Sequence, residues 1–305
     1  MGKIVVVGSM NMDYVIQLDR FPAPGETVAG HSLELFLGGK GANQCVSVAR
    51  LGGDAEMVGM LGRDANGETF RSLLRTEGIR HAHVYDCDAP TGMAQIQVNA
   101  RGQNCICLVA GANHRFGEAE LERARETVTA ASMVIVQLEL RIEAVEQVVA
   151  LAHGAGVPVL LNPAPAVPLS PEMLAQVDYI TPNETELAVL TGMPTDTPEE
   201  QRLAAERLLE MGVGCVVATL GSHGAMIVTR KGVQTVAGFH VEAVDTVAAG
   251  DSFNGALAVA LTEGKSLSEA VRFANAMGAL TVTEKGAIPS LHRRAEVEAF
   301  LTAHT

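Results

Sequence analysis

The chain has 305 residues and a mass of 32.0 kDa, enough for one large α/β domain or for a core domain with a small addition. Hydrophobic residues make up 48% of it, so a large core can form and the composition argues against global disorder. The formal charge of −13 and the lack of tryptophan argue against a nucleic-acid partner, because phosphate backbones attract cationic proteins and bases stack on aromatic rings.

Hydropathy and cysteine content bear on the compartment. No apolar run approaches the ~20 residues that a membrane-spanning helix needs, so we expect no membrane partner. The odd, scattered set of five cysteines is typical of reduced thiols, so we expect a cytoplasmic protein. Cys105 and Cys107 would point to the same face of a strand, but no second cysteine pair or nearby histidine supports a metal or redox role for them.

Short apolar runs alternate with stretches of helical periodicity along the chain. The runs predict buried strands at residues 4–7, 57–61, 133–136, 157–161, 179–181 and 215–220. Helical periodicity covers residues 118–130, 142–153 and 199–211. Strands that alternate with helices predict a three-layer α/β/α fold around a mostly parallel central sheet.

Two segments, residues 13–37 and 91–108, interrupt this alternation. Both alternate apolar with polar residues, and the first is rich in proline and glycine, which is typical of antiparallel strands with one solvated face. We expect them to form a small β-sheet, called the lid below, within a single domain of residues 1–305. The apolar face of the lid would need cover from a ligand cleft or from a second subunit.

The most informative segment is residues 245–255, DTVAAGDSFNG, which leads into an apolar helical stretch. Small residues let unpaired backbone N–H groups crowd together at the start of a helix, where they form an anion site. Asp251 would lie at the mouth of that site, where a carboxylate can take a proton from a hydroxyl that attacks phosphorus. The spacing alone leaves it equally open that Asp251 is only a favourable acid in a first helical turn.

A second glycine-rich segment, LGGKGANQ at residues 37–44, opens an amphipathic helix. Its glycines allow close approach of a ligand to the backbone, and Lys40 and Asn43 add polar groups, although a plain strand-to-helix turn is the simpler interpretation. It is no Walker A loop, because Glu34 stands in the place of the first glycine and Gly41 in the place of Ser or Thr. A dinucleotide fingerprint is also lacking after residues 4–7, which argues against an oxidoreductase.

Further polar residues follow the predicted strands. Asn183 and Glu186 fit a helix capping box, and alternatively Glu186 could organise water around Mg²⁺. The 219–224 loop, with Asn11, Asp13 and Glu139, lies at the carboxyl edge of the sheet, where ligands bind in open α/β folds. Asn275 stands among small residues that leave room for a flat ring, although a buried amide bonded to backbone explains it as well.

Taken together, these segments resemble the ribokinase-like, or phosphofructokinase-B type, family of carbohydrate kinases. The resemblance runs from residue 5 to residue 290 and includes two signatures, GGKGANQ at 38–44 and DTVAAGDSF at 245–253. NPAPA at 162–166 and PNETE at 182–186 support it.

The resemblance implies a role for each matching position. Asp251 would be the general base on a primary hydroxyl of the sugar, beside an amide cradle formed by Ala248, Ala249 and Gly250. Sugar-binding positions would be Asn11, Asp13, Gly39, Lys40, Gly41, Asn43 and Glu139. ATP-binding positions would be Asn183, Thr219, Leu220, Gly221, Ser222, His223, Gly224, Gly250 and Asn275. Glu186 would serve Mg²⁺, and a monovalent cation, normally K⁺, would be held by Asp245, Val247, Thr281, Glu284, Gly286 and Ser290.

The implied activity is ATP-dependent phosphorylation of the 5-hydroxyl of a pentose, with D-ribose as the leading substrate. Deoxyribokinase and nucleoside kinase remain alternatives; a carboxylate at Asp13 that grips ring hydroxyls would penalise sugars that lack them. A sugar- or nucleotide-binding regulator without catalysis is the alternative from another class, and the intact Gly250–Asp251 pair argues against it. We also expect the lids of two subunits to pair in a homodimer.

Overall fold

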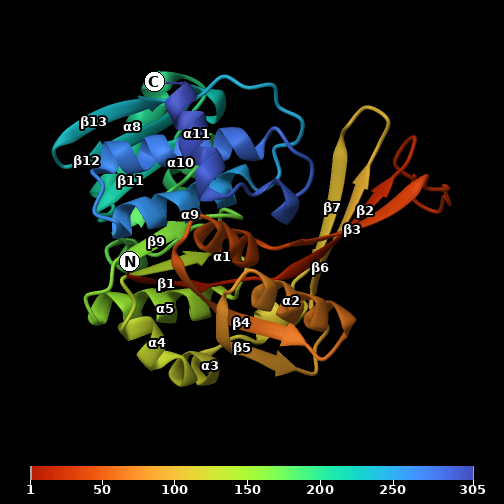
Figure 1. The fold of residues 1–305 in the computed structure, drawn as a ribbon. Helices are drawn as coiled ribbons and strands as arrows, with labels where there is room; N and C mark the ends of the chain where they lie inside the picture. The colour runs from red at the N-terminus through yellow and green to blue at the C-terminus, as the bar shows by residue number, and fades with distance from the viewer. Residues whose placement is uncertain (1, 305) are drawn as a thin grey trace.

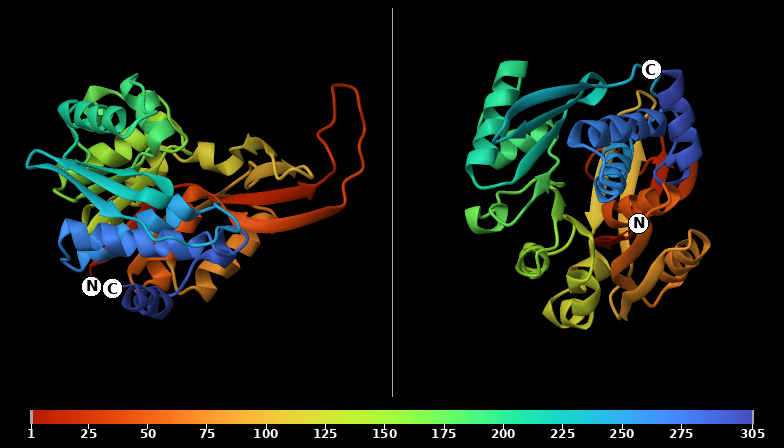
Figure 2. Two further views of the ribbon diagram at one scale, coloured as in Figure 1. Left: turned by 90° about the horizontal axis from the view of Figure 1, so that it is seen from above. Right: turned by 60° about the vertical axis from the view of Figure 1, so that its left-hand side comes forward.

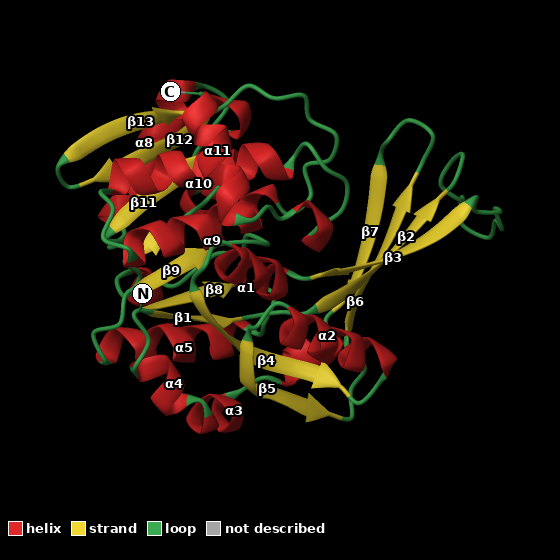
Figure 3. Ribbon diagram, in the orientation of Figure 1, coloured by secondary structure: helices red, strands yellow, loops and turns green. Residues whose placement is uncertain are grey.

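The structure, a computed structural model, describes residues 2–304 and contains two β-sheets (Figures 1 and 3). The central sheet has nine strands in the order β13-β12-β11-β10-β9-β8-β1-β4-β5. Their bounds, in chain order, are β1 Lys3–Val7, β4 Asp54–Gly62, β5 Arg80–Cys87, β8 Met133–Gln137, β9 Val159–Asn162, β10 Tyr179–Ile180, β11 Cys215–Thr219, β12 Gly224–Thr229 and β13 Gly232–Ala237. All pairs from β11 to β5 are parallel, and β12 and β13 add an antiparallel hairpin at one edge.

Helices cover both faces of this sheet (Figure 2). One layer consists of α1 Lys40–Arg50, α2 Ala65–Thr76, α9 Ala249–Thr262, α10 Leu267–Thr281 and α11 Arg294–Ala303. The other consists of α3 Glu118–Arg123, α4 Arg125–Thr129, α5 Ile142–Gly154, α6 Pro171–Leu174, α7 Glu184–Thr191 and α8 Pro198–Glu210. Short 3₁₀ turns are η1 Gly111–Arg115, η2 Gly221–His223 and η3 Ile288–Ser290.

The sequence of β1 shows why the sheet is buried on both faces. Successive side chains of a strand point to opposite faces, and Ile4 and Val6 pack into one helical layer while Val5 and Val7 pack into the other. Because both faces are covered, the strand has no polar alternation. The predicted three-layer fold with a mostly parallel sheet is confirmed.

The second sheet is the lid, which projects from the body of the molecule (Figure 1). It comprises β2 Asn11–Gln17, β3 Ser32–Gly38, β6 Gly92–Val98 and β7 Asn104–Val109, in the order β3-β2-β6-β7. Both interrupting segments of the sequence therefore contribute to one sheet. Five large apolar side chains of the lid are 44–57% exposed: Leu33, Leu35, Ile106, Leu108 and Val109.

Some elements differ from the sequence prediction. β5, β12 and β13 were not predicted, because β5 and β13 are edge strands with few buried residues and β12 is a short apolar run directly after a glycine loop. The single helix predicted at 118–130 is two helices, since the chain turns at Ala124 so that Leu121 and Val128 both stay buried. No helix in the described part of the chain is long and apolar enough to cross a bilayer.

Candidate active site

The carboxyl group of Asp251 is buried in the first turn of α9, with 7% of the residue exposed. Asn43 Nδ2 donates to its Oδ2 at 2.9 Å, and Gln44 Nε2 donates to its Oδ1 at 3.0 Å. These two donors come from α1, the helix that follows the glycine-rich segment. The glycine loop and the 245–255 segment therefore meet directly at this carboxylate, although the bonded residues are 207 and 208 positions apart in sequence.

The cradle before Asp251 has an unusual backbone. Ala248, the N-cap of α9, has φ 61°, and it is the only non-glycine residue with positive φ among residues 2–304. The left-handed conformation costs an L-residue roughly 1–2 kcal/mol, so the surroundings must hold it in place. Asp245 is one such support, because Val247 N donates to its Oδ1 at 3.1 Å.

A chain of buried amides orients Asp251, and the sequence did not predict it. Gln44 Nε2 also donates to Asn162 Oδ1 at 3.0 Å, and Gln44 Oε1 accepts from Gln137 Nε2 at 2.6 Å. The partners lie at the ends of β8 and β9, where the parallel strands terminate beside α9. The bond from Gln137 to Gln44 Oε1 fixes the orientation of the Gln44 amide, so its NH₂ group faces Asp251. This N–H donor keeps the Asp251 carboxylate in place.

A second carboxylate, Glu139, gathers three donors at one oxygen. Its Oε2 accepts from Ser9 Oγ, from Asn11 Nδ2 at 3.1 Å and from Lys40 N at 3.2 Å. Asn11 is fixed in turn by Asn113, whose Nδ2 donates to Asn11 Oδ1 at 2.7 Å. The sequence predicted Asn11 and Glu139 but not Ser9 or Asn113.

Charge is concentrated around these groups. Burial, together with the nearby carboxylates of Glu139 and Asp251, raises the pKa of Asp13 to about 7. Burial alone would lower the pKa of Lys40, but Asp251, Glu139 and Glu186 outweigh it, so the pKa is raised and the ammonium is retained. Burial also raises the pKa of Glu186, against the opposing effect of its bond to Asn183 N. Among residues 2–304, Lys40 is thus the cation that faces the carboxylates of Asp251, Glu139 and Glu186, so it would also attract a phosphate.

Two cavities meet at the cradle. The larger, of about 450 Å³, is mainly apolar and has predicted ATP-binding residues in its wall: Asn183, Thr219, Gly221, Ser222, Gly224, Gly250 and Asn275. The smaller, of about 200 Å³, is lined by Lys40, Glu186, Ala248, Asp251 and others. Both include Asn183, Thr219, Thr246 and Gly250. A ligand that fills the first cavity can therefore extend past Gly250 to Asp251.

Two predicted nucleotide positions do not line the larger cavity. Leu220 packs against the core cluster that includes residues of α7 and α8, and His223 lies in η2 outside the wall. Asn275 does line it, and its Nδ2 donates to the carbonyls of Val236 and Ala237, as the backbone-bonded alternative requires. The sequence missed much of the apolar wall: Phe239, Val241, Ala243, Phe253, Gly278, Ala279 and Val282.

The residues predicted to bind metals occupy two places. Glu186 forms the capping box with Asn183, through bonds of 2.8 and 2.9 Å, and still borders the smaller cavity. At the second place, the 281–290 segment meets Asp245, whose Oδ2 accepts from Gly286 N at 2.9 Å. Two hydroxyls there donate their protons to carbonyls, Thr281 Oγ1 to Met277 O and Ser290 Oγ to Ala287 O, which leaves lone pairs on both oxygens. The Glu284 side chain turns away toward His292, 3.8 Å from its Nε2.

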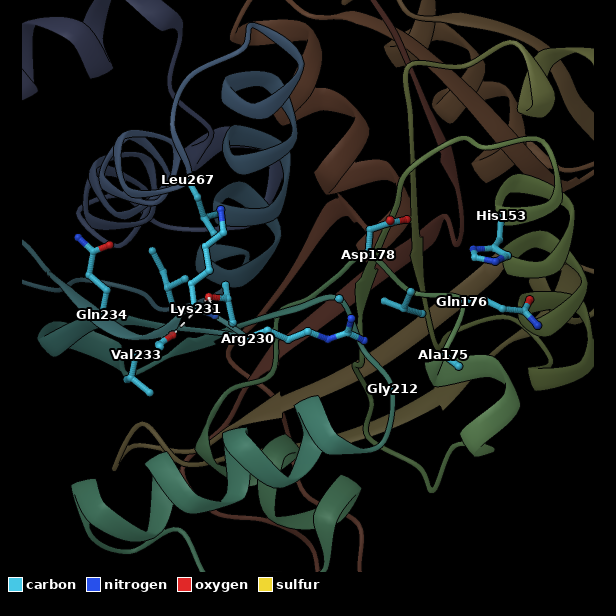
Figure 4. A pocket seen from close by; sticks show the side chains of 15 residues that line it. His153, Ala175, Gln176, Asp178, Gly212, Arg230, Lys231, Val233, Gln234 and Leu267 are labelled. Carbon is cyan, nitrogen blue, oxygen red and sulfur yellow. Dashed lines mark hydrogen bonds between the residues drawn. The ribbon is translucent and has the colours of Figure 1, made fainter.

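A third cavity, of about 810 Å³, lies at the opposite edge of the sheet and contains none of the predicted site residues (Figure 4). Arg230 and Lys231 border it at the turn between β12 and β13. Asp178 and the C-terminal ends of α5 and α8, at His153 and Gly212, face the same space, and helix C-termini carry partial negative charge. These opposing charges leave no concentrated anion site there.

Comparison with known proteins identifies carbohydrate kinases as similar to this chain. Residues 1–294 match the model of the pfkB family carbohydrate kinases. The chain is 41% identical over 300 residues to ribokinase of Haemophilus influenzae, covering 98% of each chain, and 35% identical over 285 residues to deoxyribokinase of Salmonella typhi, covering 93% of each. A solved structure of Arabidopsis thaliana ribokinase complexed with ribose and ATP superimposes with a TM-score of 0.94 at 37% identity, over 98% of each chain. This chain therefore belongs to the pfkB family of carbohydrate kinases.

Proposed function

We propose that the protein transfers the γ-phosphoryl group of ATP to the primary 5-hydroxyl of a pentose, with D-ribose as the leading substrate. One observation carries this proposal: the buried carboxylate of Asp251 stands where the nucleotide-sized cavity meets the cluster of polar groups under the lid. The ribokinase structure from Arabidopsis, which holds ribose and ATP, supports the choice of both ligands.

In this mechanism Asp251 accepts the proton of the sugar hydroxyl as that oxygen attacks the γ-phosphorus. Asn43 and Gln44 hold the carboxylate in the required orientation through their N–H groups. Charge that develops on the transferred group would be stabilised by the backbone N–H groups of the cradle and by Lys40. A closed lid would exclude water, which otherwise competes with the sugar as acceptor.

The groups under the lid suit a polyhydroxylated ligand. Asn43 Oδ1 is buried and has no hydrogen-bond partner within the described residues, so it is an unsatisfied acceptor that a sugar hydroxyl would satisfy once the side chains that cover it move aside. Glu139 engages its protein donors through Oε2, which leaves Oε1 for a ligand. Asp13, on the lid strand β2, completes a set of acceptors that favours a ligand with several hydroxyl donors.

The proposed cations fit the chemistry of the donors available. No group of three or more His, Cys, Asp or Glu placed to hold a metal occurs in residues 2–304, which agrees with a Mg²⁺ that keeps most of its waters and touches Glu186 only indirectly. Mg²⁺ would neutralise charge on the ATP phosphates. K⁺ would be held by Asp245, by main-chain carbonyls at Val247 and 281–290, and by the oxygens of Thr281 and Ser290, which donate their protons to carbonyls and so keep lone pairs for a cation.

We also propose that two lids pair in a homodimer in the cytoplasm. The exposed apolar side chains of the lid, defined above, would be covered by this pairing. The five cysteines are all free, as in reduced proteins.

A coupled assay of ADP release tests the substrate. With ATP, Mg²⁺ and K⁺, D-ribose should give the highest kcat/KM in a panel of D-ribose, 2-deoxy-D-ribose, other pentoses, hexoses and nucleosides. A higher value for 2-deoxy-D-ribose would favour the deoxyribokinase alternative, which the Salmonella relative keeps open. ADP release from none of them would refute the kinase proposal, and binding without turnover would favour the regulator.

A further inference from the structure

Lid strand β3 contacts the loop that follows α10. The Phe36 ring lies against Gly286: a Cβ built on that glycine would be 3.2 Å from Phe36 Cδ1. One residue earlier in the loop, Lys285 Nζ is 2.7 Å from Glu34 Oε2. The turn η3 of the same loop lies beside β3 (Figure 1). Glu34 and Phe36 are two residues apart and therefore share one face of the strand.

The same loop supports the cradle. Gly286, at φ 90°, donates its N–H to Asp245 Oδ2 at 2.9 Å, and Asp245 Oδ1 accepts from Val247 N at 3.1 Å. Ala248, in its left-handed conformation, follows immediately. A displacement of Gly286 would therefore release Asp245 from one of its two N–H donors next to the strained residue.

β3 also contacts the sugar side of the site. Phe36 stands directly opposite Asp13 in the β2–β3 pair, so their side chains share the face that looks toward the body. Gly38 ends the strand so close to Asp13 that an added Cβ would lie 2.5 Å from its Oδ2. One strand thus contacts both a predicted sugar ligand and the support of the cradle.

We propose that Phe36 and the Glu34–Lys285 pair are positioning residues, which couple closure of the lid over the sugar to the geometry of the amide cradle. The cradle then reaches its reactive form only when the lid is down, which limits transfer of phosphate to water. The expected effect on phosphate transfer rests on the proposed kinase function. The expected contact between the lid and the cradle does not.

Passive packing is the simpler explanation to exclude. The Glu34 and Lys285 side chains are 41% and 56% exposed, and ion pairs that open to solvent add little stability. If Phe36 only covered Gly286, its truncation would lower global stability without any selective effect on the cradle. Hydrogen exchange and kinetics separate the two explanations.

Hydrogen exchange of the ligand-free protein, followed by mass spectrometry, tests the structural coupling. Phe36→Ala should speed exchange at least about threefold in peptides covering 245–252 as well as in 284–290, because local opening follows loss of local contacts. Ser32→Ala is the control, since Ser32 is an exposed residue at the start of β3 and is not among the apolar residues proposed to pair in the dimer. Faster exchange confined to 284–290, or equal effects of the two variants, would overturn the proposal.

Steady-state kinetics with D-ribose test the functional coupling. Phe36→Ala should lower kcat by roughly two- to thirtyfold, the range for single residues along such contacts, with the KM for ATP nearly unchanged. Hydrolysis of ATP in the presence of D-ribose should rise relative to sugar phosphorylation. Phe36→Leu should restore most of kcat, and Glu34→Gln and Lys285→Met should not be additive.

Two kinetic results would contradict the coupling between the lid and the cradle. An unchanged kcat for Phe36→Ala, or additive effects of the two ion-pair variants, would refute the coupling. Failure of the wild-type protein to phosphorylate any sugar would refute the proposed function alone, because the exchange comparison needs no substrate.

Discussion

Asp13 makes the stability of the ligand-free protein depend on pH. Its folded pKa of about 7, against the ordinary 3.8, means that the folded protein holds a proton between these pH values that the unfolded chain has lost. Stability contributed by this group is therefore present in acid and is lost as pH rises through about 7. Asp13→Asn removes the titration.

The size of the effect follows from the difference in pKa. One pH unit is worth about 1.4 kcal/mol, so the full difference of about three units corresponds to about 4 kcal/mol. Between pH 5 and pH 8 the wild-type protein should lose about 2–3 kcal/mol relative to Asp13→Asn. Asp13→Asn is the more stable protein at high pH relative to wild type, because it does not place a charged carboxylate in a buried site beside Glu139 and Asp251.

Urea unfolding of both proteins at pH 5 and pH 8, without sugar or nucleotide, measures this difference. Asp88→Asn is a suitable control, because the Asp88 side chain is 91% exposed and its removal should have nearly the same effect at both pH values. An equal difference in stability between wild type and Asp13→Asn at pH 5 and at pH 8 would show that the Asp13 carboxyl group does not have a raised pKa. It would contradict the proposed burial of Asp13 beside two other carboxylates.

Two further predictions concern the amide network and the lid. Gln44→Leu should lower the free energy of unfolding by about 2–5 kcal/mol, because Asn162 Oδ1 and Gln137 Nε2 lose their buried partner. Urea unfolding measures this loss. A loss below about 0.5 kcal/mol would mean that the amide network adds no stability. Ile106→Glu places a charge on the exposed lid and should convert a dimer into a monomer in light scattering, with an unchanged circular dichroism spectrum. A wild-type protein that scatters as a monomer would contradict lid pairing.

Local patterns made much of the fold and part of the site predictable. The doubly buried run at 4–7, the capping box of Asn183 and Glu186 and the position of Asp251 in a first helical turn each depend on a few adjacent residues. The alternation in the lid segments likewise predicted strands, whose pairing the structure then showed. In each case the physical cause, side-chain periodicity or a free helix end, is local in sequence.

The missed features depend on tertiary contact. Gln44, Gln137 and Asn162 lie on α1, β8 and β9, and no spacing in the sequence relates them. A weak sequence signal existed, because Gln44 falls at helical spacing from Val48 and Leu51 and so lies on the apolar side of α1, where the structure buries it completely. The walls of the nucleotide cavity at Phe239, Val241 and Ala243 come from a segment without regular structure, where apolar residues carry no period.

The identity of Asp251 as the general base is the central claim, and the rate of Asp251→Asn tests it most directly. Asparagine keeps the size of the side chain but cannot take the proton, so the rate of formation of D-ribose 5-phosphate should fall by about 10²–10⁴-fold. Binding of ATP, measured by calorimetry, should remain close to that of the wild type, because the nucleotide cavity does not include the side chain. Turnover within tenfold of the wild-type rate would contradict the account.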